Sequence, residues 1–404
     1  MTVAIIAELN PPHAGHAHLI EEVRRVYGAD ATVLVLLAGN YVQRGDLAMV
    51  DKYVRAAGAL AIGADLVLEL PFPYSFSTAQ IYARAAVSLL NALGICDILA
   101  FGSELGDLAS LCEIASYLSS DAYTAAIQSA REQENLSSYI QLRTQLIREN
   151  LSNEAALASS LPNNILAIEY LLALRQTMSS MQPFTVKRCG SYHAKTSSDK
   201  EYPSATALRN AVSAKNISEI ERYCSADFAL LLKQALRDGD APAEIDRLSA
   251  VFLTKLAWVD KGRDFSECFD IDSSLSHRMK TALPSVATLS ELFTVLKAKN
   301  LTDAHIRRAV FNAYFGVTPE EIHTPPSYTR LLAMNERGRA FFKHIREYST
   351  FPILVRPADK SLLKDATVKA AVERADFADA LYLQSLPTPQ SAANLNKKAP
   401  LVMK

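Results

Sequence analysis

The sequence predicts an α/β fold, in which a Rossmann-like parallel sheet is followed by a mainly helical C-terminal part. Three observations lead to this prediction. Short apolar runs alternate with segments of helical periodicity over residues 3–101, which is typical of a doubly wound parallel sheet. A polar loop with two histidines follows the first apolar run, where such folds bind their ligands. After residue 217 the apolar spacing is almost wholly helical.

The first half of the chain contains the elements of the predicted sheet. Residues 32–37 form a continuous apolar run of the kind that is buried on both faces of a sheet. Further strands are expected at residues 3–7, 66–70, 98–101 and 184–186, and helices at residues 51–62, 80–93, 105–161 (several) and 164–174. Because the strands are expected to be parallel, the loops that follow them should gather at one edge of the sheet.

The loop after the first strand is suited to phosphate binding. Pro11 and Pro12 require a turn, since proline fixes φ and donates no hydrogen bond. The N-terminus of the following helix attracts phosphate oxygens, and Gly15 lets the backbone approach them. His13 and His16 are three residues apart, so they should lie on one side of the helix and both donate to a phosphoryl group. An HxGH sequence alone also occurs by chance, but its position after the first strand favours a nucleoside triphosphate site.

Composition excludes several classes of protein. At 404 residues, with 49% hydrophobic and 21% charged residues, the chain has the composition of a globular protein with two domains. It has no apolar run of about 20 residues and no signal sequence, so we expect no membrane association and a cytoplasmic location. The five cysteines are scattered without a CxxC pair, so neither a metal site nor a disulfide framework is predicted.

Charge differs between the two halves. Residues after 250 carry an excess of Lys and Arg, whereas the preceding residues carry an excess of Asp and Glu. This division suggests that a polyanion binds mainly to the C-terminal part, although ordinary variation in surface charge would give the same count. The candidate contacts form one basic run: Arg330, Arg337, Arg339, Lys343 and Arg346. Residues 190–203 are polar without an apolar period and are a candidate lid or binding loop.

Several sequence blocks occur in a recognisable order. They are HAGH at residues 13–16, AGNYVQRG at 38–45, GADLVLELP at 63–71, FGSE at 101–104 and PNNIL at 162–166. The first resembles the HxGH signature of the nucleotidyltransferase superfamily, and the set resembles the bacterial tRNA(Met) cytidine acetate ligase family. The similarity continues through Lys187-Arg188, SATALR at 204–209 and YTRLLAMNERG at 328–338, and so covers most of the chain.

This resemblance implies an ATP-dependent ligase. In such an enzyme acetate attacks the α-phosphate of ATP, and the acetyl-adenylate then acetylates N4 of the wobble cytidine of elongator tRNA(Met). The resemblance implies Mg²⁺ beside ATP and no obligatory protein partner. It also implies a nucleotidyltransferase-type catalytic domain that binds ATP and a helical domain that binds tRNA. The apolar pattern and its breaks place these domains at residues 1–220 and 221–385, and the composition of residues 386–404 indicates a flexible tail.

The same resemblance assigns roles to individual residues. His13 and His16 would stabilise the α-phosphate, and Lys187 and Arg188, with Arg209, would hold the leaving pyrophosphate. The implied nucleotide-contacting residues are Ile6, Ala7, Glu8, Leu9, Asn10, Pro11, Pro12, His13, Ala14, Gly15, His16, Ala17, His18, Leu19, Gly102, Asn163, Asn164, Arg188, Ser204, Thr206 and Arg209.

Alternatives remain open at this stage. Ser204, Asn163 and Asn164 also fit plain helix caps, and Gly102 also fits a turn. Leu9 and Pro12 stand where the family usually has aromatic residues, and Asp46-Leu47 replaces its usual Glu-Pro, which puts details of the pocket in doubt. The same motifs would serve a small-molecule adenylyl- or cytidylyltransferase. A nucleotide- or RNA-binding protein without catalysis is a third possibility, which the presence of both histidines disfavours.

Overall fold

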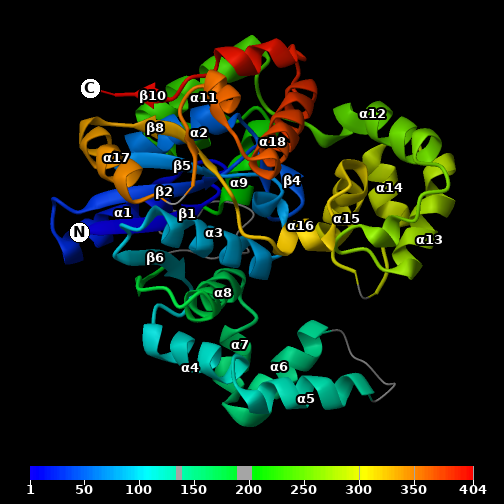
Figure 1. Ribbon diagram of the computed structural model, residues 1–404, viewed down its shortest axis with the longest axis horizontal. Coiled ribbons are helices and arrows are strands. Elements are labelled where there is room, and N and C mark those ends of the chain that lie inside the picture. The colour runs from blue at the N-terminus through cyan, green and yellow to red at the C-terminus, as the bar shows by residue number, and fades with distance from the viewer. Residues whose placement is uncertain (133–138, 189–202, 300, 350, 404) are drawn as a thin grey trace.

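The computed structural model describes residues 1–132, 139–188, 203–299, 301–349 and 351–403. Its centre is an eight-stranded sheet (Figure 1). The strands lie in the order β10 (Leu401–Val402), β8 (Thr329–Met334), β5 (Leu66–Leu70), β2 (Thr32–Ala38), β1 (Thr2–Ala7), β6 (Ile98–Ser103) and β7 (Gln182–Lys187), and β9 (Ile353–Leu354) pairs with β8. Strands β5, β2, β1, β6 and β7 are parallel, which confirms the predicted fold class.

Helices cover both faces of this sheet because its strands alternate apolar side chains between the faces. Val3 and Ile5 of β1 pack with Ile20 of α1 (Ala14–Tyr27) and with α2 (Lys52–Ala61). Ala4 and Ile6 face α3 (Ala79–Leu93) and α8 (Pro162–Gln176). The chain passes from β1 to β2 on one side, whereas β6 lies on the other side of β1. A crevice is therefore expected outside the carboxyl ends of β1 and β6.

Two groups of helices extend from the central layers (Figure 1). One contains α4 (Leu108–Leu118), α5 (Asp121–Glu132), α6 (Tyr139–Asn150) and α7 (Asn153–Ala158). The other contains α12 (Ser249–Thr254), α13 (Ser273–Ala282), α14 (Leu289–Val295), α15 (Asp303–Phe315) and α16 (Pro319–His323). The remaining helices are α9 (Ala205–Ser213), α10 (Ser218–Tyr223), α11 (Ala226–Asp238), α17 (Glu336–Tyr348) and α18 (Ala366–Gln384). Among the helices of the described ranges, none has both the length and the apolar character of a membrane span.

The C-terminal half departs from the predicted helical pattern at three short strands. Strand β8 pairs antiparallel with β5, and its residues Leu331 to Ala333 are fully buried. Its Leu, Ala and Met residues are good helix formers, so only the tertiary contacts select the strand. Within the predicted tail at 386–404, Leu401 and Val402 pair with β8, and the flexibility of the tail stays a prediction. The division of the chain at residue 220 stays a prediction, as does the lid at 190–203, of which only Pro203 lies within the described residues.

A buried ionic network joins α18 to this side of the sheet. The Lys52 Nζ atom lies 2.6 Å from Glu69 Oε1 and 2.5 Å from Asp379 Oδ2. Asn40, in the loop after β2, donates from Nδ2 to Asp379 Oδ1 at 3.0 Å. Burial alone would lower the pKa of Lys52, but the Asp379 and Glu69 carboxylates outweigh burial and raise it. The network thus ties α18 to the loops that lead to the carboxyl edge.

Arg330 belongs to the same network and is not available for a polyanion. Its guanidinium is 2.8 Å from Asp376 Oδ1 and 3.5 Å from Glu69 Oε2, and the residue is buried. Sequence analysis placed it in a basic docking run because the apolar residues after it suit a helix equally well. The other cations of that run lie on α17, which starts beside Asp65 at the amino end of β5. There Gly338 is needed, since a Cβ would come within 1.9 Å of the Asp65 carbonyl oxygen.

Candidate active site

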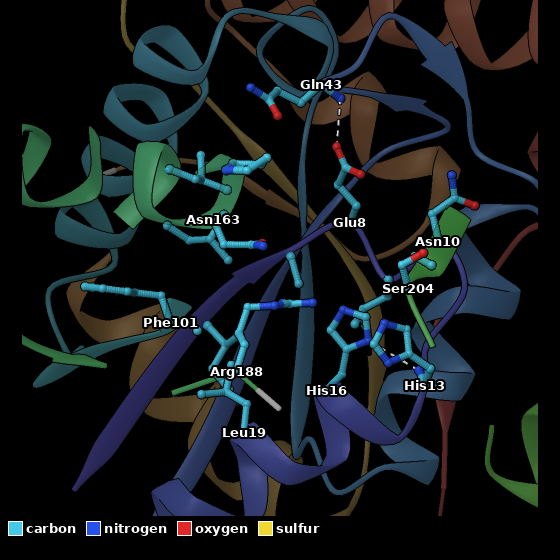
Figure 2. A pocket seen from close by; sticks show the side chains of 18 of the residues that line it. Glu8, Asn10, His13, His16, Leu19, Gln43, Phe101, Asn163, Arg188 and Ser204 are labelled. Carbon is cyan, nitrogen blue, oxygen red and sulfur yellow. Dashed lines mark hydrogen bonds between the residues drawn. The ribbon is translucent and has the colours of Figure 1, made fainter. Parts of the chain in front are cut away.

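A cavity of about 190 Å³ lies at the carboxyl ends of β1 and β6. Fourteen of the predicted site residues line it: Ile6, Ala7, Glu8, Leu9, Asn10, His13, His16, Leu19, Gly102, Asn163, Arg188, Ser204, Thr206 and Arg209. They come from the β1–α1 segment, the end of β6, the start of α8, the end of β7 and the start of α9 (Figure 2). The structure therefore gathers at one site residues that are up to two hundred positions apart.

The loop between β1 and α1 is held from both sides. Arg55 donates from Nη1 to the Glu8 carbonyl oxygen at 2.7 Å, and it also binds the carbonyls of Ala38 and Gly39. Asn10 accepts from the backbone N–H of Met49 at 2.9 Å. These bonds occupy the polar groups of an irregular buried segment. The two histidines thus start from a fixed backbone.

His13 and His16 form a reciprocal cap at the start of α1. His13 is the N-cap residue, and its Nδ1 accepts from the Gly15 N–H at 3.0 Å. His16 Nδ1 accepts from the His13 N–H at 3.3 Å. Because both Nδ1 atoms accept, the proton of each neutral ring belongs on Nε2. The ring centroids are 4.0 Å apart, and both rings face the cavity (Figure 2).

Both imidazoles are neutral at physiological pH. Burial, with a smaller effect from the Arg188 charge, lowers the pKa of His13 from 6.5 to about 3. Burial and the neighbouring His13 ring hold the pKa of His16 well below its usual range. A neutral imidazole with its proton on Nε2 is a hydrogen-bond donor without a charge. The pair can therefore donate two preorganised hydrogen bonds to an oxygen on which negative charge develops.

The start of α9 lines the cavity beside the β1–α1 loop. Ser204 caps the helix, with Oγ accepting from the Ala207 N–H at 3.1 Å. Arg209 donates from Nη1 to the Asn10 carbonyl at 2.7 Å and from Nη2 to Thr206 Oγ1 at 3.0 Å. The guanidinium is therefore anchored to the β1–α1 loop beside the N-terminus of α9. Such an N-terminus with an adjacent arginine suits phosphate oxygens.

Asn163 and Asn164 have different roles, although sequence analysis treated them alike. Asn163 lines the cavity, and its Nδ2 donates to Glu104 Oε1 at 2.6 Å. Asn164 is fully buried and does not line it. Its Oδ1 accepts from the N–H groups of Glu104 and Leu105, and its Nδ2 donates to the Ala158 carbonyl. Asn164 therefore holds the loop after β6, and its predicted contact with the nucleotide is not supported.

Lys187 is also outside the cavity. Residues 187 and 188 end β7, where successive side chains point to opposite faces, and only Arg188 lines the pocket. Lys187 is exposed and packs on Gly106, where a Cβ would lie 2.4 Å from the Lys187 Cβ. Lys187 therefore does not line the cavity, and its predicted catalytic role stays a prediction. The other predicted residues that do not line the cavity are Pro11, Pro12, Ala14, Gly15, Ala17 and His18.

The cavity also contains residues that sequence analysis did not identify. They are Ile5, Gln43, Arg44, Tyr82, Phe101, Pro162, Leu166, Tyr170 and Ala205. Pro162, Leu166 and Tyr170 are spaced by four along α8, so the face of that helix that contains Asn163 was a detectable signal. Tyr82 carried no such signal, and Gln43 stood out only as part of the block AGNYVQRG, because the sheet topology brings α3 and the loop after β2 to the cavity.

The described residues contain no group of three His, Cys, Asp or Glu side chains arranged to hold a metal ion. Glu8 is the acidic residue among those that line the cavity. Its Oε1 accepts from the Gln43 N–H at 2.9 Å. A hard cation that enters this cavity would therefore need oxygen ligands from a bound anion.

Comparisons with known proteins show the family of the chain. Residues 1–397 match the model of the family described as HIGH Nucleotidyl Transferase. The tRNA(Met) cytidine acetate ligase of Caldanaerobacter subterraneus is 33% identical over 94% of each chain. That of Syntrophotalea carbinolica is 34% identical over 87% of this chain and 84% of its own. The crystal structure of Thermotoga maritima TmcAL bound with alpha-thio ATP has the same fold, with a TM-score of 0.89, 24% identity and coverage of 100% and 99%. The chain therefore belongs to the HIGH nucleotidyl transferase family and, within it, to the family of the tRNA(Met) cytidine acetate ligases.

Proposed function

We propose that this protein is an ATP-dependent ligase that acetylates N4 of the wobble cytidine of elongator tRNA(Met). The proposal rests on one observation: the two neutral imidazoles and the capped N-terminus of α9 line the same cavity. This arrangement offers uncharged donors at one position and cationic donors at the next. An α-phosphate and its leaving pyrophosphate need those two environments side by side. The relatives named tRNA(Met) cytidine acetate ligase support the choice of substrates.

The first step joins acetate to AMP. A carboxylate oxygen of acetate attacks the α-phosphorus of ATP, and the bond from the α-phosphorus to the oxygen bridging to the β-phosphate breaks. Acetate is ionised at neutral pH, so the step needs no general base. His13 and His16 donate to the α-phosphate oxygens as charge builds on them, while Arg209 and the N–H groups of α9 receive the pyrophosphate.

The second step transfers the acetyl group. N4 of the cytidine attacks the acetyl carbonyl carbon, the bond from that carbon to the AMP oxygen breaks, and N4 loses one proton. Among the described residues that line the cavity, Glu8 is the one carboxylate, so the lining offers Mg²⁺ few oxygen ligands of its own. Mg²⁺ would therefore enter bound to the phosphates of ATP and reduce their charge. We place the catalytic site in residues 1–220 and assign tRNA binding to residues 221–385. The exposed cations of α17 remain candidates for that contact.

The test is exchange of labelled pyrophosphate into ATP without tRNA. Exchange that requires acetate is expected, because the groups assigned to the first step precede residue 210. If exchange instead requires a phosphorylated small metabolite and is indifferent to acetate, the protein is a small-molecule nucleotidyltransferase. If tRNA is needed as well, closure on tRNA precedes adenylation, and the acetate requirement still separates the two enzymes.

A further inference from the structure

One side of the cavity is unsuited to phosphate. Glu8 and Gln43 lie together there, apart from the two imidazole rings (Figure 2). The Glu8 carboxylate is held by the Gln43 N–H at 2.9 Å, and its backbone carbonyl is held by Arg55 at 2.7 Å. A fixed carboxylate would repel a triphosphate, so this side is better matched to a ligand that donates hydrogen bonds.

Tyr170 supplies a second polar group to the same cavity. Its hydroxyl oxygen is buried and has no hydrogen-bond partner among the residues that the structure describes. Burial, together with the Glu8 charge nearby, holds the pKa of Tyr170 well above its usual range. The hydroxyl therefore keeps its proton and can donate. Because buried polar groups are nearly always paired, a ligand atom is the expected partner of this hydroxyl.

An accepting carboxylate and a donating hydroxyl in one cavity have the polarity that one edge of cytosine requires. Cytosine presents the N4 amino group, which donates, beside N3, which accepts. A carboxylate that accepts from N4–H is a recognised contact for this base, and the tyrosine hydroxyl can donate to N3. Uracil presents O4 and N3–H at the same positions, so both contacts would be mismatched. A site of paired polar groups rejects a mismatched ligand strongly, because its groups are left unpaired.

We propose that Glu8 and Tyr170 form a cytosine-reading subsite and that Glu8 takes the N4 proton during acetyl transfer. This inference rests on the proposed function. The new bond joins N4 to the acetyl carbonyl carbon, the bond from that carbon to the AMP oxygen breaks, and the N4 proton passes to a Glu8 carboxylate oxygen. AMP leaves with the electron pair of the broken bond. A general base must lie within reach of the proton that it removes. The cytosine would therefore be flipped out of its stack into the cavity.

The first test isolates the transfer step by supplying synthetic acetyl-adenylate and tRNA to the full-length protein in single turnover. Glu8→Gln keeps the shape and one accepting oxygen but cannot take a proton, so the transfer rate should fall about 10²- to 10⁴-fold. Transfer by Glu8→Gln within about threefold of wild type would overturn the role of Glu8. Failure of the wild type to form N4-acetylcytidine would count against the proposed function instead.

The second test uses Tyr170→Phe, which removes one oxygen and no hydrogen bond to any residue that the structure describes. Its thermal stability should be unchanged or higher, while transfer to a cytidine anticodon stem-loop falls about tenfold relative to transfer of acetyl to hydroxylamine. Tyr328→Phe is the matched control, because Tyr328 is buried outside the cavity and its hydroxyl also has no hydrogen-bond partner among the described residues. If Tyr170→Phe instead raises the KM for acetate and leaves the cytidine reaction unchanged, the hydroxyl belongs to the acetate site and the subsite proposal is wrong.

Discussion

Replacement of His13 removes two separable interactions from the start of α1. The first is the helix cap, in which Nδ1 accepts from the Gly15 N–H at 3.0 Å. The second is the Nε2–H donor that faces the cavity, opposite the capping nitrogen of the same ring. Alanine removes both. Asparagine keeps a capping oxygen near the position of Nδ1 but cannot place a donor where Nε2 lies.

The two variants therefore separate stability from catalysis. Loss of an N-cap costs about 1 kcal/mol, with a range of roughly 0.5–2, so His13→Ala should unfold at lower denaturant concentration and His13→Asn close to wild type. Removal of one preorganised donor costs about 10²- to 10³-fold in rate. Both variants should show that loss. The hydrogen bond from the His13 N–H to His16 Nδ1 involves only the backbone of residue 13 and persists in both.

Two assays decide the outcome. Urea denaturation gives the free energy of unfolding, and release of pyrophosphate from ATP and acetate gives the adenylation rate. If His13→Asn releases pyrophosphate at nearly the wild-type rate, the ring acts only as a cap. The assignment of both imidazoles to the α-phosphate would then be wrong.

Three further predictions concern the site and its support. Arg188→Ala should lower the rate of pyrophosphate release by at least tenfold. Lys187→Ala should leave that rate near wild type, because Lys187 lies outside the cavity. Equal losses in the two variants would instead support the catalytic role that the sequence predicted for Lys187. Because burial lowers the pKa of His13 from 6.5 to about 3, the unfolded chain binds a proton between those values that the native chain does not take up. The free energy of unfolding should therefore be highest with respect to this group above pH 6.5 and should fall as the pH is lowered, by about 3 kcal/mol at about pH 4.5. In urea denaturation across this range, the free energy of unfolding of His13→Asn should depend less steeply on pH than that of the wild type. Lys52→Met leaves two carboxylates buried without their cation and should cost about 3–5 kcal/mol in urea denaturation, whereas Lys233→Met, which breaks an exposed ion pair, should cost far less; similar losses would refute the structural role of the network.

Much of the catalytic half was predictable because local signals and tertiary structure agree there. The strand at residues 66–70 was predicted at its observed bounds, and the histidine loop follows β1 as expected. Prediction failed where the deciding interaction is long-range. The local sequence of β8 predicts a helix, and only its pairing with β5 makes it a strand. The sequence around Arg330 predicts a surface cation, whereas in the fold Glu69 and Asp376 surround its guanidinium.

Within the site, the sequence did not predict the direction in which neighbouring side chains point. Sequence motifs identified Lys187 and Arg188, and Asn163 and Asn164, as pairs. Strand alternation separates the first pair, and the hydrogen bonds of Asn164 to the loop after β6 separate the second. Tyr170 was missed because a tyrosine on a helix is ordinarily core, and only its unpaired hydroxyl distinguishes it.

The most direct test of the proposed function is the chemical identity of the modified nucleoside. The purified protein should be incubated with ATP, labelled acetate and bacterial tRNA, and the nucleosides of the recovered tRNA analysed by mass spectrometry. We predict one labelled N4-acetylcytidine, at the wobble position of elongator tRNA(Met), formed only when ATP and acetate are both present. Recovery of unmodified tRNA while ATP is consumed with another acceptor would contradict the ligase assignment.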